Sequence, residues 1–199
     1  MNNNIWEIKQ AEKIACIDID GVLMSCYPEC WINYLNEELS TNFKDLNETK
    51  KNVSYDDYRQ IKEKYRKSGI KETFPADPYA AEVTEALKQN GYSIIIMTAR
   101  PANKYPELYH QTINWLNKNK ILYDNIYFGE KDKHAKILSE MHHIKFCIED
   151  NSYIANQIAK WGYKVYLVNT KYNEGLKTEP KVVRIDNLNE IKEVHNEQI

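Results

Sequence analysis

Short runs of apolar residues alternate along the chain with longer stretches in which apolar residues recur at helical spacing. The short runs are bounded by polar residues or glycine, a pattern typical of strands that are buried on both faces. They cover residues 14–17, 94–97, 126–128, 144–148, 165–168 and 182–185. Strands that alternate with amphipathic helices indicate βα units, so the pattern predicts an α/β fold built on a parallel sheet.

The stretches between the runs carry recognisable helix signals. Asp77 can cap a helix that begins near Pro78, and Asn90-Gly91 can end it before the second predicted strand. A further helix is predicted after position 106, with an apolar stripe formed by Tyr109, Ile113 and Leu116. Each helix would pack against the sheet through its apolar face.

The interval 27–74 does not follow this alternation. It is polar, it has helical periodicity, and it contains no run suited to a strand. We therefore expect a core made of residues 1–26 and 75–199, and a small helical insertion at 27–74 that covers the end of the sheet as a cap. Its segment 59–67 is locally basic, which indicates either a solvated helix face or a positive surface that attracts an anionic substrate.

Composition narrows the class of protein. A hydrophobic content of 42% and a charged content of 28% are typical of a soluble globular protein, and 199 residues suffice for one core with an insertion. The net charge of −2 argues against a general, strongly basic nucleic-acid binder. No apolar stretch is long enough to cross a bilayer and the N-terminus lacks signal-peptide features, so we expect a cytoplasmic protein with no membrane partner. The sequence leaves the oligomeric state unknown.

The pentapeptide Asp18-Ile19-Asp20-Gly21-Val22 directly follows the first predicted strand. Side chains alternate along a strand, so Asp18 and Asp20 point to the same side of the sheet. Two neighbouring carboxylates are costly unless a cation or a proton separates their charges, and Gly21 allows a sharp turn near a ligand. The motif indicates either an ordinary Asp-Gly turn or a carboxylate nucleophile beside an acid/base group.

Further polar groups follow the other predicted strands, and parallel strands bring their carboxyl ends to one edge of the sheet. We therefore expect a single site at that edge. The additional groups are Thr98, Ala99 and Arg100 after the second strand, Glu149 and Asp150 after the 144–148 run, and the lysines of the turn and helix that precede that run, Lys133 and Lys136.

The chemistry of phosphate-ester hydrolysis assigns roles to the acids. Asp18 would attack phosphorus and form an aspartyl-phosphate, while Asp20 would protonate the leaving alcohol and then accept a proton from water. Mg²⁺ prefers oxygen ligands, which we expect from Asp18, from Asp20 through a backbone carbonyl, and from Asp150. Glu149 would orient these ligands without itself coordinating the metal.

The remaining groups suit the phosphate itself. Thr98 offers a hydroxyl, and the turn through Ala99 and Arg100 offers backbone N–H groups. The Arg100 side chain would either contact phosphate or brace the acidic loop. Lys133 is the preferred lysine for offsetting the charge of the phosphate, because its spacing aligns it with the buried face of its helix, and Lys136 is the second choice.

These motifs resemble those of the haloacid dehalogenase-like (HAD) hydrolase superfamily. The pentapeptide 18–22 matches its first motif, Thr98 its second, an upstream lysine its third and Glu149-Asp150 its fourth, over about residues 14–168. The order of the motifs and the insertion between the first two match the type with a helical cap. The resemblance implies a Rossmann-like three-layer core.

Within the superfamily the chain is most similar to the 5'(3')-deoxyribonucleotidase-like group. The similarity rests on Asp-x-Asp-Gly-Val-Leu, the short helical cap, a Pro-Tyr-Ala helix start and Thr98-Ala99-Arg100-Pro101. It implies Mg²⁺-dependent dephosphorylation of nucleoside monophosphates. The chain departs from the group at Met24-Ser25-Cys26, where a base-stacking aromatic is usual and the first aromatic here is Tyr27, and at Glu149, where Asp is commoner.

The leading functional hypothesis is therefore a Mg²⁺-dependent phosphomonoesterase that acts through an aspartyl-phosphate on a phosphorylated small molecule, a nucleoside monophosphate first. One alternative keeps the enzyme class but changes the substrate to a sugar phosphate or to the 3'-phosphate end of a nucleic acid, which the basic segment 59–67 motivates. Nucleic acid is not the favoured partner. An alternative of another class is a catalytically silent protein that binds a phosphorylated ligand.

Overall fold

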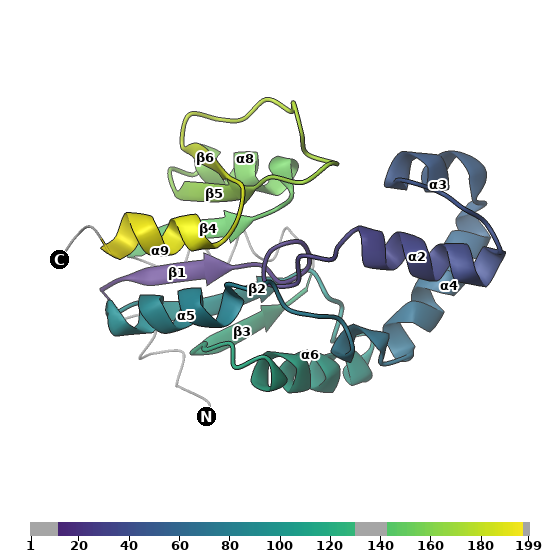
Figure 1. The fold of residues 1–199 in the computed structure, drawn as a ribbon, viewed down its shortest axis with the longest axis horizontal. Coiled ribbons are helices and arrows are strands. Elements are labelled where there is room, and N and C mark those ends of the chain that lie inside the picture. Colours follow the sequence, from purple (N-terminus) through teal and green to yellow (C-terminus); the bar gives the residue numbers. More distant parts are fainter. Residues whose placement is uncertain (1–11, 130–142, 197–199) are drawn as a thin grey trace.

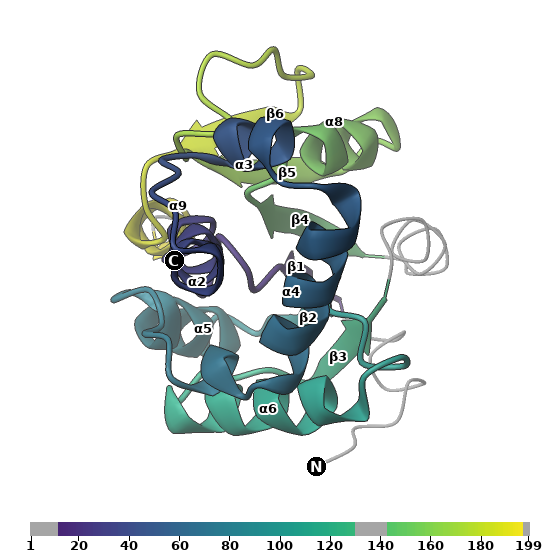
Figure 2. The same cartoon turned by 90° about the vertical axis from the view of Figure 1, so that its right-hand side faces the viewer.

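A computed structural model describes residues 12–129 and 143–196 of the chain (Figures 1 and 2). Its centre is a six-stranded sheet with the order β3-β2-β1-β4-β5-β6, and each pair of neighbouring strands is parallel. The strands are β1 (Ile14–Ile17), β2 (Ser93–Thr98), β3 (Asn125–Phe128), β4 (Ile144–Glu149), β5 (Lys164–Val168) and β6 (Val182–Ile185). The predicted α/β fold with a parallel sheet is confirmed.

Helices cover both faces of the sheet, which explains why the strands are continuous apolar runs. One face packs against α5, α6 and α9, and the other packs against α8 (Figure 2). The bounds are α5 (Ala80–Gln89), α6 (Pro106–Lys118), α8 (Ser152–Lys160) and α9 (Asn189–Asn196). The expected three-layer arrangement of a Rossmann-like core is therefore present.

The apolar stripe predicted for α6 is wrong in part. Leu116 is buried, but Tyr109 is 44% exposed and its ring lies 5.3 Å from that of Phe128. The helix is rotated so that Thr112 and Trp115 face inward, where the Thr112 hydroxyl accepts from buried Arg100 and the Trp115 indole N–H donates to the carbonyl of Phe74, partners that spacing does not reveal.

The interval between β1 and β2 forms helices and no strand. These elements, named here the cap helices, are α2 (Glu29–Leu39), α3 (Leu46–Asn52), α4 (Tyr55–Lys67) and the 3₁₀ turn η1 (Ile70–Glu72). In Figure 1 they lie beyond the carboxyl ends of the strands. The helical content agrees with the expectation for 27–74, while the division of the chain into a core and a cap at those boundaries stays a prediction.

Local sequence signals fix the starts of two cap helices. The Asp45 carboxylate accepts hydrogen bonds from the N–H groups of Asn47 and Glu48 at the start of α3, and the Ser54 hydroxyl accepts one from Asp57 N at the start of α4. The cap helices then bury a hydrophobic cluster of their own, made of Trp31, Tyr34, Leu35, Ile61 and Tyr65. Across the two described ranges, no helix is long and apolar enough to span a lipid bilayer.

Candidate active site

The loop after β1 comes so close to β4 that only glycine fits at its tip. Gly21 has φ of +95°, and its N–H donates to the carbonyl of Met24 at 2.9 Å. A Cβ atom built on Gly21 would collide with the Asp150 carboxylate. Glycine therefore serves two needs here, the left-handed backbone and the close approach of the two acidic loops.

Three acidic side chains converge at these strand ends. β1 and β4 are neighbours, with Ile17 paired to Ile148, so the residues that follow them emerge side by side. Carboxylate oxygens of Asp18, Glu149 and Asp150 lie within 4.8 Å of one another. We call these three residues the acidic cluster.

Within the acidic cluster Glu149 and Asp150 are buried and Asp18 is half-buried, and the charges repel one another. Burial, followed by the charge of Asp20, raises the pKa of Asp18 to about 7. Burial, followed by the charges of Asp18 and Asp150, raises the pKa of Glu149 well above its usual range. In the described part of the chain, Oε2 of Glu149 is buried without a hydrogen-bond partner. Oxygen donors, close spacing and an unsatisfied carboxylate oxygen all fit a hard divalent cation such as Mg²⁺.

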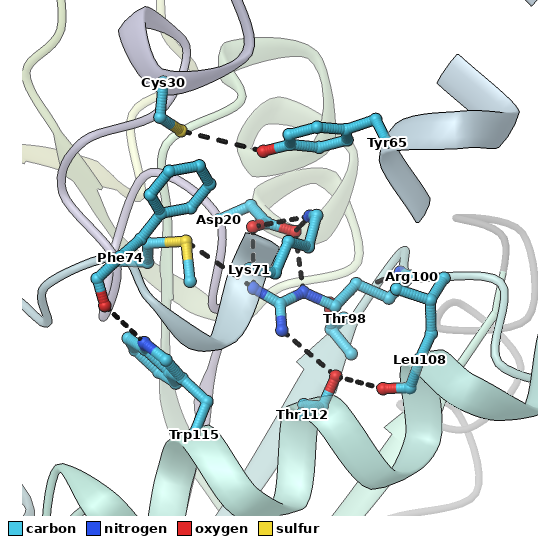
Figure 3. Close-up of polar contacts among 11 residues, drawn as sticks. Asp20, Cys30, Tyr65, Lys71, Phe74, Thr98, Arg100, Leu108, Thr112 and Trp115 are labelled. Carbon is cyan, nitrogen blue, oxygen red and sulfur yellow. Dashed lines mark hydrogen bonds and ion pairs between the residues drawn. The ribbon is translucent and has the colours of Figure 1, made fainter. Parts of the chain in front are cut away.

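Asp20 belongs to a different set of contacts (Figure 3). Its carboxylate accepts two hydrogen bonds from the Arg100 guanidinium, at 3.0 Å from Nε and 2.8 Å from Nη2. Nζ of Lys71 lies 2.9 and 3.0 Å from the same two oxygens. Burial opposes ionisation, but Arg100 and then Lys71 more than offset it, so the pKa of Asp20 lies well below its usual range. The carboxylate of Asp20 is thus held by cations, apart from the acidic cluster.

Arg100 braces the acidic loop. It is 3% exposed, and its third nitrogen, Nη1, donates to the hydroxyl of Thr112 at 3.0 Å. That hydroxyl in turn donates to the carbonyl of Leu108 at 2.6 Å, which ties Asp20 to α6 through two side chains (Figure 3). Of the two expectations for the Arg100 side chain, phosphate contact or brace, the geometry matches the brace.

Lys71 is the site residue that sequence reasoning missed. It lies in η1 and is 8% exposed, although lysine is rarely buried unless its charge is paired. No local pattern distinguishes it from the other lysines of the cap helices. Only the burial of η1 against α6 and the charge of Asp20 explain its position.

The remaining predicted residues fall in two places. Thr98 ends β2 and is fully buried, and its hydroxyl accepts the N–H of Arg100 at 3.4 Å. Ala99 is exposed in the turn that follows and lines the cavity described next. Lys133 and Lys136 lie outside the described residues, so the choice between them stays a prediction.

A cavity of about 370 Å³ separates the acidic residues from the cap helices. Asp18, Asp20 and Asp150 line one side of it. The opposite side is aromatic and basic, and its residues include Tyr27, Tyr58, Tyr65, Lys50, Lys62 and Arg66. Trp31 is fully buried inside the cap helices and does not line the cavity.

No family model matches the chain, but solved structures and one curated relative are similar to it. Among solved structures, a protein assigned as a beta-phosphoglucomutase from Thermotoga maritima superposes with a TM-score of 0.63 at 16% identity, over 94% of this chain and 100% of that one. A HAD-superfamily hydrolase from Ehrlichia chaffeensis gives a TM-score of 0.54 at 13% identity, over 92% and 96% of the two chains.

A third solved structure, the D,D-heptose 1.7-bisphosphate phosphatase from B. bronchiseptica with magnesium and phosphate, gives a TM-score of 0.54 at 13% identity, over 94% and 99% of the two chains. These structures show the shared fold.

A nucleotidase from Clostridium acetobutylicum is 30% identical over 165 residues, which are 79% of this chain and 81% of the relative. The chain belongs to the HAD hydrolase superfamily. The enzyme class predicted for this HAD hydrolase, a phosphatase, is confirmed, while the 5'(3')-deoxyribonucleotidase-like subgroup stays a prediction.

Proposed function

We propose that this HAD hydrolase is a Mg²⁺-dependent phosphomonoesterase that acts on nucleotides, nucleoside monophosphates first, through an aspartyl-phosphate on Asp18. The observation that carries the proposal is the convergence of Asp18, Glu149 and Asp150 beneath a cavity. The similarity to a nucleotidase supports the choice of nucleotides, and the aromatic side chains of the cavity suit a flat base.

The acidic cluster would hold the metal, together with the backbone carbonyl of Asp20. A bound Mg²⁺ supplies the positive charge that lets a carboxylate approach a phosphate dianion. Glu149 was expected to support the ligands without binding the metal, but its carboxylate, like that of Asp150, lies within 4.8 Å of the Asp18 carboxylate. We therefore include Glu149 among the candidate ligands.

Two displacements at phosphorus make up the reaction. The lowered pKa of Asp20 keeps it ionised before the reaction, so it must first take up a proton from solvent. Oδ of Asp18 then forms a bond to phosphorus while the bond to the leaving oxygen breaks, and Asp20 gives that oxygen the proton. A water molecule then attacks the aspartyl-phosphate, Asp20 takes its proton, and the bond from phosphorus to Asp18 breaks to release phosphate. Lys71 and Arg100 keep the Asp20 carboxylate in a fixed position, so any proton transfer must loosen one of these contacts.

The transferred phosphate needs donors of its own. We assign this task to the hydroxyl of Thr98, the N–H groups of Ala99 and Arg100, and Lys133, with Lys136 as second choice. The N–H of Arg100 would exchange its 3.4 Å contact with the Thr98 hydroxyl for one with the phosphate. A sugar phosphate would use the same donors, but it would leave the aromatic side of the cavity without a matching group. That difference favours nucleotides over sugar phosphates.

The test measures phosphate release from para-nitrophenyl phosphate and from nucleotides, with Mg²⁺ and with EDTA. We expect Asp18→Asn to lose about 10³-fold or more in kcat/KM, because the bond-forming oxygen is replaced by an amide. Asp56→Asn, which changes an exposed carboxyl on α4, is the matched control. Full activity of Asp18→Asn, or full activity in EDTA, would contradict the proposal.

A further inference from the structure

Three basic side chains on the cap side of the cavity have no acidic partner among the residues that the structure describes. Lys50 comes from α3, and Lys62 and Arg66 come from α4. Within residues 12–129 and 143–196, none of the three forms an ion pair with a carboxylate. By contrast, Lys64 and Lys67 of α4 do form ion pairs, Lys64 with Glu38 at 2.6 Å and Lys67 with Glu63 at 2.7 Å. The helix thus carries paired lysines on its outside and unpaired cations towards the cavity.

Lys62 is the most constrained of the three. Its side chain is half-buried, and Nζ lies 3.8 Å from the centre of the Trp31 ring and 5.5 Å from that of Tyr65. Burial, followed by the charge of Lys71, lowers its pKa to about 7. A desolvated ammonium without a carboxylate partner is costly, and an anion in the cavity would offset that cost.

The other charges of the cavity already have partners or assigned tasks. Lys71 and Arg100 are held by the Asp20 carboxylate. The acidic cluster would be offset by the metal, and the transferred phosphate by the donors at the strand ends. The cavity places Lys50, Lys62 and Arg66 on the cap side, where the leaving group of the substrate would lie.

We propose that the leaving group carries a second phosphate, which Lys62 and Arg66 bind with support from Lys50. The inference rests on the proposed function and deepens it, because it names the kind of nucleotide: one whose sugar bears two phosphates. Three cations around one anion match the charge of a phosphate better than that of a carboxylate, and the Arg66 guanidinium suits its oxygens. The second phosphate belongs either to a free nucleoside bisphosphate or to the diester at a 3'-phosphate end.

The first experiment compares kcat/KM for four substrates at low ionic strength. They are a nucleoside 5'-monophosphate, a nucleoside 3',5'-bisphosphate, a dinucleotide with a 3'-terminal phosphate, and para-nitrophenyl phosphate. We expect the bisphosphate or the dinucleotide to exceed the monophosphate by about tenfold or more, as for one charge-assisted contact. Whichever of the bisphosphate and the dinucleotide has the higher kcat/KM shows whether the second phosphate belongs to a free nucleotide or to a nucleic-acid end. Equal values for monophosphate, bisphosphate and dinucleotide would overturn the inference.

Variants localise the preference. Lys62→Met and, separately, Arg66→Met should reduce the kcat/KM ratio of the doubly phosphorylated substrate to the monophosphate about tenfold. The kcat/KM for para-nitrophenyl phosphate should stay within about twofold of the wild-type value. Lys64→Met is the matched control, because it removes the same charge from the same helix at a residue paired with Glu38. An undiminished preference in both cavity variants, with circular dichroism showing a folded chain, would overturn the inference.

A binding measurement separates this inference from the proposed function. In the Asp18→Asn background, calorimetry compares the affinity of the bisphosphate and the monophosphate with and without Lys62→Met. A Lys62-dependent gain for the bisphosphate supports the inference even if the wild type releases no phosphate, in which case only the proposed function fails. Normal phosphatase activity without that gain overturns the inference and leaves the proposed function in place.

Discussion

The acidic cluster and the cap helices lie on opposite sides of one cavity, but different interactions hold them in place. The acidic cluster is fixed by backbone pairing, since Ile17 of β1 pairs with Ile148 of β4 and the N–H of Asp18 donates to the carbonyl of Ile148 at 3.1 Å. The cap helices are fixed by side-chain packing around Trp31 and by the ion pair of Lys71 with Asp20.

The difference indicates that the two sides have separate roles. Groups that must meet one phosphorus atom are set by the sheet, which tolerates little displacement. Groups that would choose the leaving group come from a helical layer with its own small core, which can change its surface without disturbing the sheet. If this separation holds, a substitution on one side of the cavity changes only the property that this side controls.

The largest effect is expected from removing the centre of the cap packing. Trp31→Ala should lower the free energy of unfolding by about 3–5 kcal/mol, because the indole is fully buried among aromatic rings. Urea unfolding followed by tyrosine fluorescence and circular dichroism measures the loss. Trp161→Ala, at a position 47% exposed, is the control. Equal stability of the two variants would show that the cap packing contributes little.

A substitution at the acidic loop should act on chemistry instead. Gly21→Ala forces a Cβ against the Asp150 carboxylate, so we expect kcat/KM to fall about 100-fold and Mg²⁺ to be needed at higher concentration. Gly91→Ala is the matched control, since Gly91 also has a positive φ, of +78°, but has open space where the Cβ would stand. A loss of activity in both variants would point to backbone strain alone.

The same contrast explains which parts of the molecule could be predicted from the sequence. Asp18 and Asp150 were predictable because each follows an apolar run, and parallel topology brings such positions together. Lys71 was not, because its contact with Asp20 joins residues 51 positions apart and depends on how a helical layer folds over the sheet. The exposure of Tyr109 was mispredicted for a related reason: a polar residue, Thr112, occupies the buried face of α6.

The Arg100 brace, which ties Asp20 to α6, can be weakened without changing a residue of the acidic cluster or of the cap helices. Thr112→Val leaves an N–H of the buried Arg100 guanidinium without its acceptor, so we expect a loss of about 1–3 kcal/mol in unfolding free energy and a several-fold lower kcat. Thr84→Val removes an equally buried helical hydroxyl in α5, which likewise accepts an N–H, that of Leu122 at 3.2 Å, and is the matched control. If both variants lost stability equally and kept the same kcat, Arg100 would be a structural residue only.

The smallest expected effect is a pH dependence confined to substrates with a second phosphate. Lys62 has a lowered pKa of about 7, so its ammonium is present below that pH and is lost above it. The charged and titratable groups that act on it are Lys71, Asp20, Arg66 and Cys30. KM for the doubly phosphorylated nucleotide should therefore rise several-fold as pH increases through 7, and the bound anion should move the midpoint upward by favouring the charged form.

The corresponding rise should be absent for para-nitrophenyl phosphate and absent in Lys62→Met, because neither combination brings a second anion to that ammonium. A rise of the same size for both substrates in the wild type would instead assign the titration to the acidic side of the cavity, and the separation of chemistry from leaving-group choice would then not hold.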